Sequence, residues 1–106
     1  MGDNPGMFVG LARFDLFIPH STSLKDKRQV LRPVIERLRK KLNVSVAEID
    51  HQNLWQRAGV GVSCVSGSID QCRKVIQEVE KMVGRAALEG AEVVDRTIEV
   101  VAMEDL

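Results

Sequence analysis

SLKDKRQVLRPVIERLRKKL, residues Ser23–Leu42, is the stretch from which the fold of this chain can be worked out. At 100° per residue, its apolar side chains fall within about 60° of Leu31 and form a stripe typical of a helix packed on a core. The stripe comprises Leu24, Val34, Ile35, Leu38 and Leu42. Ser23 and Asp26 supply an N-terminal cap, whereas Pro33 predicts a kink or a late start of the helix.

Most of the positive charge of the chain lies on this helix. Residues 23–42 hold eight of the 15 Lys and Arg residues and two of the 15 Asp and Glu residues, so they carry +6. The rest of the chain holds seven basic and 13 acidic residues and carries −6. One flank of the helix carries Lys25, Arg28, Arg32 and Arg39. This field attracts polyanions, although a solvated basic face is also common on helices.

Alternating apolar residues predict strands on both sides of the helix. The first runs over Met7–Ile18, and others follow over residues 44–50, 57–66 and 92–103. A second helix is expected between a Ser68 cap and Gly90. The order β-α-β-β-α-β predicts an α+β fold, a ferredoxin-like sandwich with two helices on one face of a four-stranded antiparallel sheet. We expect residues 1–6 to be a mobile N-terminal tail and residues 7–106 to be a single domain.

Composition and motifs argue against several classes of protein. No apolar run approaches the ~20 residues of a membrane span, and the polar start predicts a cytoplasmic protein without a signal peptide. Cys64 and Cys72 are expected to be small buried thiols, and two histidines offer little for a metal. The spacing of Ser and Cys residues relative to His20 and His51 does not match a catalytic triad, and no phosphate-binding glycine loop is present. We therefore expect neither an enzyme nor a cofactor or metal site.

The loop DHQNLWQR, Asp50–Arg57, holds the single tryptophan and leaves two interpretations open. In one it is a partner-binding loop, with Trp55 as an apolar anchor beside Asp50, Gln52 and Gln56. In the other it is a hairpin connection in which Trp55 folds over the edge of the core. We favour the second interpretation because tryptophan is usually largely buried.

The helix-free face of the predicted sheet is the remaining candidate surface. It lacks the aromatic residues on which RNA-recognition domains stack bases, since only Phe17 lies on that side of the first strand and the third strand has none. It does carry Val9, Leu11 and Val65 beside charged residues. A face of this kind is a candidate for covering by a second copy of the chain in a homodimer.

The strings SLKDKRQVLRPVIERLRKKLNVSVAEID and DHQNLWQRAGVGV together resemble the YlxP-like bacterial family, whose function is unknown. The resemblance runs from about Val9 to the last strand and implies a small ferredoxin-like fold. Members of the family are often encoded beside transcription-elongation, translation-initiation and ribosome-maturation factors, which implies by association a role near RNA or the ribosome. The resemblance implies no catalytic residues.

Two hypotheses follow for the function. The first is a cytoplasmic binding module that meets RNA or a ribosomal particle through a basic surface. Its candidate phosphate contacts are Lys25, Arg28, Arg32, Arg39 and Arg57. The alternative is a homodimeric protein-interaction scaffold that uses the open sheet face and the Trp55 loop.

Overall fold

The computed structural model describes residues 6–106, apart from the side chains of residues 86 and 87, and confirms the predicted order of elements. The elements are β1 (Phe8–Phe17), α1 (Leu24–Lys41), β2 (Ser45–Asp50), β3 (Arg57–Ser66), α2 (Ile69–Ala87), β4 (Glu92–Ala102) and the short 3-10 helix η1 (Met103–Asp105). The predicted mobile tail, apart from Gly6, lies outside the described residues.

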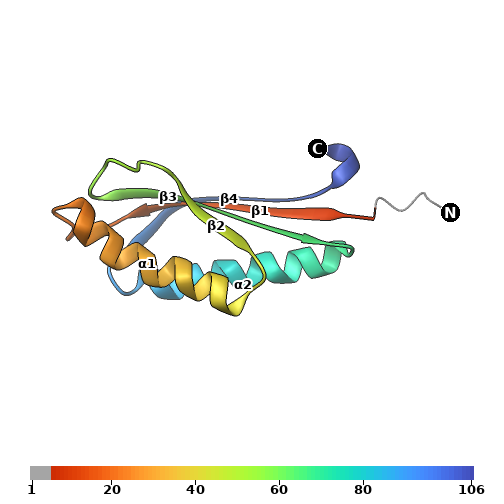
Figure 1. Cartoon of the computed structure of the whole chain (residues 1–106), viewed down its shortest axis with the longest axis horizontal. Helices are drawn as coiled ribbons and strands as arrows, with labels where there is room; N and C mark the ends of the chain where they lie inside the picture. Colours follow the sequence, from red (N-terminus) through yellow and green to blue (C-terminus); the bar gives the residue numbers. More distant parts are fainter. Residues whose placement is uncertain (1–5) are drawn as a thin grey trace.

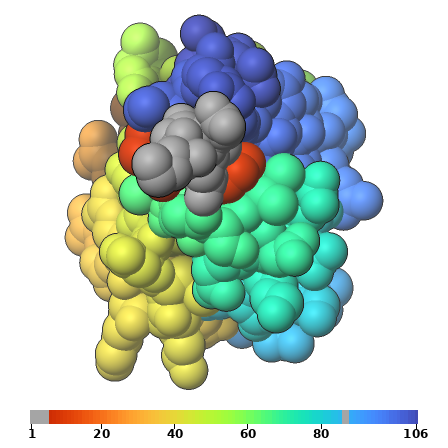
Figure 2. Space-filling view, turned by 90° about the vertical axis from the view of Figure 1, so that its right-hand side faces the viewer, coloured from red at the N-terminus to blue at the C-terminus, as the bar shows by residue number. Residues whose placement is uncertain are grey.

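The four strands form one antiparallel sheet in the order β2-β3-β1-β4. Both helices cover the same face of the sheet, and the other face carries no helix (Figure 1). Seen from the end where the C-terminus lies, α1 and α2 lie side by side beneath the sheet (Figure 2). The ferredoxin-like sandwich predicted from the sequence is confirmed.

The core forms where the helices meet the sheet. Alternate residues of β1 point toward the helices, and Phe14, Leu16 and Ile18 are almost fully buried. The predicted stripe of α1 is buried at Leu31, Val34 and Leu38 and partly buried at its other positions. The buried side chains of α2 are Cys72, Ile76, Val79, Met82 and Val83. Both cysteines are buried and neither forms a disulfide bond, and burial raises the pKa of the Cys64 thiol.

The N-terminus of α1 is capped by side chains, as predicted. The Ser23 hydroxyl accepts a hydrogen bond from the Asp26 amide at 3.0 Å. The Asp26 carboxylate accepts bonds from the amide and the hydroxyl of Thr22, both at 2.9 Å, and these bonds lower the pKa of Asp26. The helix begins at Leu24, directly after the cap, and continues through Pro33. The prediction that Pro33 delays the start of the helix is therefore wrong. Proline is tolerated here because it lies on the exposed side, where solvent can satisfy the carbonyl that its ring leaves unpaired.

Two glycines of the sheet, Gly59 and Gly10, allow neighbouring residues to approach closely, because a side chain at either position would collide with them. The pairing of β2 with β3 shifts register between Glu48 and Asp50, and a Cβ on Gly59 would lie 2.8 Å from the Asp50 Cβ. On the helix-facing side, a Cβ on Gly10 would lie 2.8 Å from both Cys64 Sγ and Ile76 Cγ1. Gly10 therefore sets how closely α2 packs on the sheet.

Replacing Gly10 with alanine is expected to destabilise the protein by about 1–3 kcal/mol, because the new methyl group overpacks the contact with α2. Gly84, inside α2, faces open space, since a Cβ there would meet nothing within 4 Å beyond its own stretch of helix. Gly84→Ala is therefore expected to stabilise the protein by about 0.4–1 kcal/mol. Urea denaturation of both variants checks the pair. A Gly10→Ala protein as stable as the wild type would contradict the close packing.

Candidate nucleic-acid interface

The basic flank of α1 borders a groove against the edge strand β2. Its volume is about 430 Å³. We call it the arginine groove; it is lined by Arg28, Leu31, Arg32, Ile35, Glu36, Arg39, Ala47 and Glu48. The arginines follow one another at intervals of four and seven residues, so helical periodicity places them on one side of α1. The groove therefore has basic side chains along its rim and aliphatic side chains at its base.

The positive charge of the groove is not neutralised by neighbouring carboxylates. Within the part of the chain that the structure describes, none of its three arginines forms an ion pair. Arg28 and Arg32 are exposed, and Arg39 donates to the Val46 carbonyl of β2. Of the two lining glutamates, Glu48 is paired with Lys27. Among the described residues, Glu36 is therefore the one lining carboxylate that is not paired with a lysine, and three arginines line the groove together with it.

The structure brings together most of the predicted anion-binding residues. Lys25 is exposed and lines an adjacent hollow of about 410 Å³ together with Arg28 and Arg32. Lys25 and the arginine groove thus form one continuous basic flank of α1. Arg57 does not line either hollow and lies beside Trp55 instead.

A buried lysine, Lys27, joins α1 to the loop that follows β2. It is 1% exposed, and its ammonium donates to the carbonyls of His51, Gln52 and Arg57 at 2.9, 3.2 and 3.3 Å. Glu48 Oε2 lies 2.9 Å from the same nitrogen. The three carbonyls use the three ammonium protons, so the glutamate is held by charge without a hydrogen bond of its own. This contact fixes the loop against the first turns of the helix.

Sequence reasoning did not single out Lys27 for burial, although the signal was available. Lys27 stands four residues before Leu31, on the core-facing side of the helix, where apolar residues are expected. A lysine in such a stripe indicates a buried cation with oxygen partners, because an unpaired charge is rarely buried. Which oxygens those are follows only from the folding of the loop.

The polar residues of the predicted partner-binding loop are engaged within the chain. The Asp50 carboxylate accepts hydrogen bonds from the Arg13 guanidinium at 2.9 Å and from the His51 amide at 2.8 Å. Both bonds lower the pKa of Asp50, and the bond from Arg13 has the larger effect. The Gln52 side chain donates to the Glu48 carbonyl. The Gln56 side chain donates to the carbonyls of Pro19 and Ser21. These side chains therefore hold the loop in place.

Trp55 does not fold over the edge of the core. Its side chain is 55% exposed, so the interpretation favoured from the sequence is wrong. The loop is held through its backbone instead, since the carbonyls of His51 and Gln52 accept hydrogen bonds from the buried ammonium of Lys27. Leu54, next to Trp55, is also exposed.

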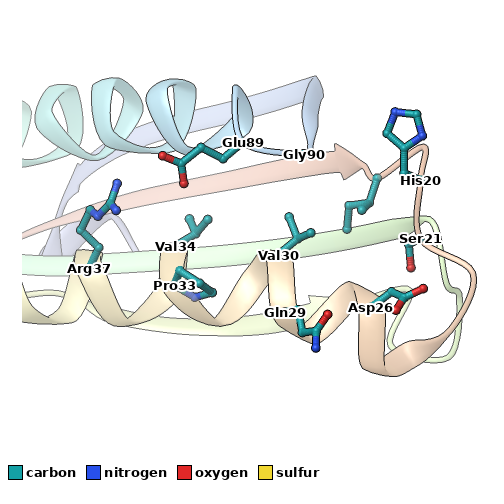
Figure 3. A pocket seen from close by; sticks show the side chains of 11 residues that line it. His20, Ser21, Asp26, Gln29, Val30, Pro33, Val34, Arg37, Glu89 and Gly90 are labelled. Atoms are coloured by element: carbon teal, nitrogen blue, oxygen red, sulfur yellow. The ribbon is translucent and has the colours of Figure 1, made fainter.

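A second hollow, of about 330 Å³, lies between α1 and the residues after α2. Figure 3 shows His20 at one end and Arg37 with Glu89 at the other, above a floor that includes Val30 and Val34. His20 and Ser21 point in different directions, and the Ser21 hydroxyl donates to the Ser23 carbonyl. The hollow therefore contains no serine activated by a histidine.

Two further features are absent from the described residues. No group of three or more His, Cys, Asp or Glu side chains there is arranged to hold a metal ion. No helix in the same part of the chain combines the length and apolar composition of a membrane span.

Comparison with known proteins identifies the family. Residues 9–98 match the family described as a protein of unknown function, DUF503. The chain belongs to the DUF503 family. It is also 41% identical over 71 residues to the uncharacterized protein YlxP of Bacillus subtilis (strain 168), covering 67% of this chain and 77% of that protein. The family resemblance carried by the sequence strings is thus confirmed.

Solved structures share the fold of this DUF503 chain at low sequence identity. A dimeric protein of unknown function and ferredoxin-like fold from Bacteroides fragilis has a TM-score of 0.58 at 16% identity, covering 92% of this chain and 97% of that one. A dimeric ferredoxin-like protein from Thermobifida fusca has a TM-score of 0.54 at 12% identity, covering 92% of each chain. A C-terminal segment of the alpha subunit of aIF2 from Pyrococcus abyssi has a TM-score of 0.53 at 16% identity, and the match covers 87% of this chain and 49% of that segment. These likenesses show the fold alone.

Replacing Lys27 with methionine is expected to destabilise the protein by about 3 kcal/mol or more, since three loop carbonyls and Glu48 lose their shared partner. Lys25→Met is the matched control, because Lys25 is exposed two residues away and its loss should change stability by less than about 0.5 kcal/mol. Urea denaturation compares the two. Equal effects would show that the buried ammonium does not hold the loop.

Proposed function

We propose that this DUF503 protein is a non-catalytic binding module that docks onto structured RNA or a ribosomal particle through the arginine groove and Lys25. The observation that carries the proposal is the set of three arginines around one groove, none of them paired with a carboxylate among the described residues. Guanidinium groups match phosphate oxygens in geometry and charge. An open, cationic groove of this kind is suited to phosphates.

The length of the basic flank favours a polyanion over a small anion. Lys25 and Arg39 are 14 residues apart on α1, so their backbones are separated by about 21 Å at 1.5 Å per residue. A single phosphate reaches one or two of these side chains, whereas a nucleic acid presents a row of charges to all of them. The association with translation and ribosome-maturation factors implied by the family resemblance agrees with RNA.

The charge balance around α1 supports the same conclusion. Of the eight basic residues in Ser23–Leu42, the structure buries only Lys27. The other seven face two acidic residues in that stretch, and one of those, Asp26, is engaged by Thr22 at the helix cap. The surface of the helix therefore keeps a strong positive field, which speeds encounter with an anionic partner.

RNA binding is expected to weaken steeply as salt rises, because each phosphate contact releases counterions. The measurement is fluorescence anisotropy of a labelled RNA hairpin titrated with protein at several salt concentrations. Combined replacement of Arg28, Arg32 and Arg39 by glutamine should weaken binding and reduce the salt slope by roughly three.

The matched control replaces Arg73, Lys74 and Lys81, exposed basic residues of α2, by glutamine. It makes the same change in net charge on the other helix. Affinity that is independent of salt, or equal losses in the two triple variants, would overturn the proposal.

The open sheet face supports a second candidate function, a homodimeric protein-interaction scaffold. Leu11, Ile49 and Val65 are exposed on strands of the sheet, and a hollow of about 470 Å³ crosses all four strands beside Leu11 and Arg13. Two proteins of the same fold are described as dimeric. Exposed apolar groups on a sheet face are a common basis for self-association.

For this second candidate, sedimentation at micromolar concentration is expected to give a dimer that Leu11→Glu converts to a monomer, because a buried carboxylate at the interface is costly. Leu88→Glu is the control, since Leu88 is strongly exposed after α2 and off the sheet. A wild-type protein that sediments as a monomer would remove the scaffold from consideration.

A further inference from the structure

The loop between β2 and β3, His51–Gln56, is held firmly at both ends. Lys27 binds its first two carbonyls at 2.9 and 3.2 Å. The Ile18 amide donates to the Gln56 carbonyl at 2.8 Å, and the Leu54 amide donates to the His51 carbonyl at 3.0 Å. His51 adopts a left-handed backbone with φ of 59°, which turns the chain at the start of the loop. The loop is therefore a pre-formed structure.

This pre-formed loop presents two large apolar side chains to solvent. Leu54 is 49% exposed and Trp55 is 55% exposed. A rigid aromatic side chain loses little conformational entropy when it is covered by a partner, and tryptophan is enriched where partners bind. The exposed indole is thus arranged for contact with a flat or apolar group of another molecule.

The charged side chain that lines the hollow beside Trp55 is that of Arg57. The indole lines a hollow of about 370 Å³ together with Asn53, Leu54, Gln56 and Arg57, a set that contains no carboxylate. Lys27 ties the same loop to the first turns of α1, where Lys25 and Arg28 are exposed. Figure 1 shows the loop and the start of α1 at the same end of the molecule. The exposed indole thus stands beside Arg57, at the end of the molecule where the basic flank of α1 begins.

We propose that Trp55 stacks on an unpaired base of RNA, while Arg57 and the arginine groove hold phosphates on either side of that base. The inference rests on the function proposed above and adds the class of RNA: a strand with an unpaired base, as in a loop, bulge or end. Within a regular duplex the bases are already stacked on one another and are not available to a side chain. The combination of an aromatic face with basic residues fits a nucleotide better than an apolar peptide, which would not use the charges.

The stacking site differs in position from that of RNA-recognition domains. Those domains stack bases on strands at the centre of the sheet, where this chain has Gly61 and Ser63 on β3. Here the aromatic side chain lies on a loop at the end of the sheet, adjacent to the helix that carries the basic flank. The ligand would accordingly pass over the end of the molecule and along α1, leaving the open sheet face free.

The single tryptophan makes this inference directly measurable, because all indole emission comes from Trp55. The probes are two RNA hairpins of the same length, one fully paired and one with a single unpaired adenosine. The hairpin with the unpaired base is expected to quench the emission and to bind more tightly. Anisotropy of the labelled hairpins gives the affinities, and Trp55→Ala should weaken binding of the unpaired-base hairpin about 10- to 100-fold, with a much smaller effect on the paired one.

Trp55→Phe, which keeps an aromatic ring, should retain part of the preference, and Val65→Ala serves as the matched control because Val65 is an exposed apolar residue at the far end of β3. Thermal unfolding confirms that the variants fold.

Salt-dependent binding of both hairpins with unchanged emission and no effect of Trp55→Ala would overturn the stacking site and leave the basic flank intact. Binding of neither hairpin at low salt would overturn both proposals. Emission that changes with protein concentration in the absence of RNA would assign Trp55 to a second copy of the chain and overturn the stacking site.

Discussion

A single buried ammonium, that of Lys27, connects the helix layer of this protein to the loop at the end of its sheet. Removing a lysine from water is costly, and the cost is offset here by three carbonyls and by Glu48. The carbonyls come from residues 51, 52 and 57, so one side chain organises both ends of the loop. Because Lys27 lies within α1, the basic flank of that helix and the exposed Trp55 are held at a fixed separation.

The charge of the molecule is arranged around the same helix. Its buried stripe packs on the sheet, while its remaining basic residues stay on the surface, and the arginine groove lies where that surface meets the edge strand β2. The match to the DUF503 family, described as a protein of unknown function, runs over residues 9–98 and so includes this helix. Lys27 links the basic flank of α1 to the loop that carries Trp55, so the two features proposed to bind RNA belong to one connected part of the structure.

Periodicity predicted the fold well because burial repeats along regular elements. The alternation in β1 and the stripe around Leu31 both anticipate the buried residues, and Ser23 caps the helix as its side chain chemistry requires. The charge separation was equally visible. Pro33 misled the prediction of the helix start, because a proline on the exposed side of a helix is tolerated when packing on the other side is strong.

The sequence by itself therefore determined the layers, the order of elements and the gathering of positive charge on one helix, since these depend on local spacing. Only the tertiary structure decided which charges remain on the surface and where Trp55 points. Lys27 is buried and Trp55 is exposed, the reverse of what their side chains ordinarily favour. The physical reason is that the carbonyls that bind the Lys27 ammonium come from residues 24 to 30 positions further along the chain. A hydrogen bond between such distant residues cannot be predicted from local sequence patterns.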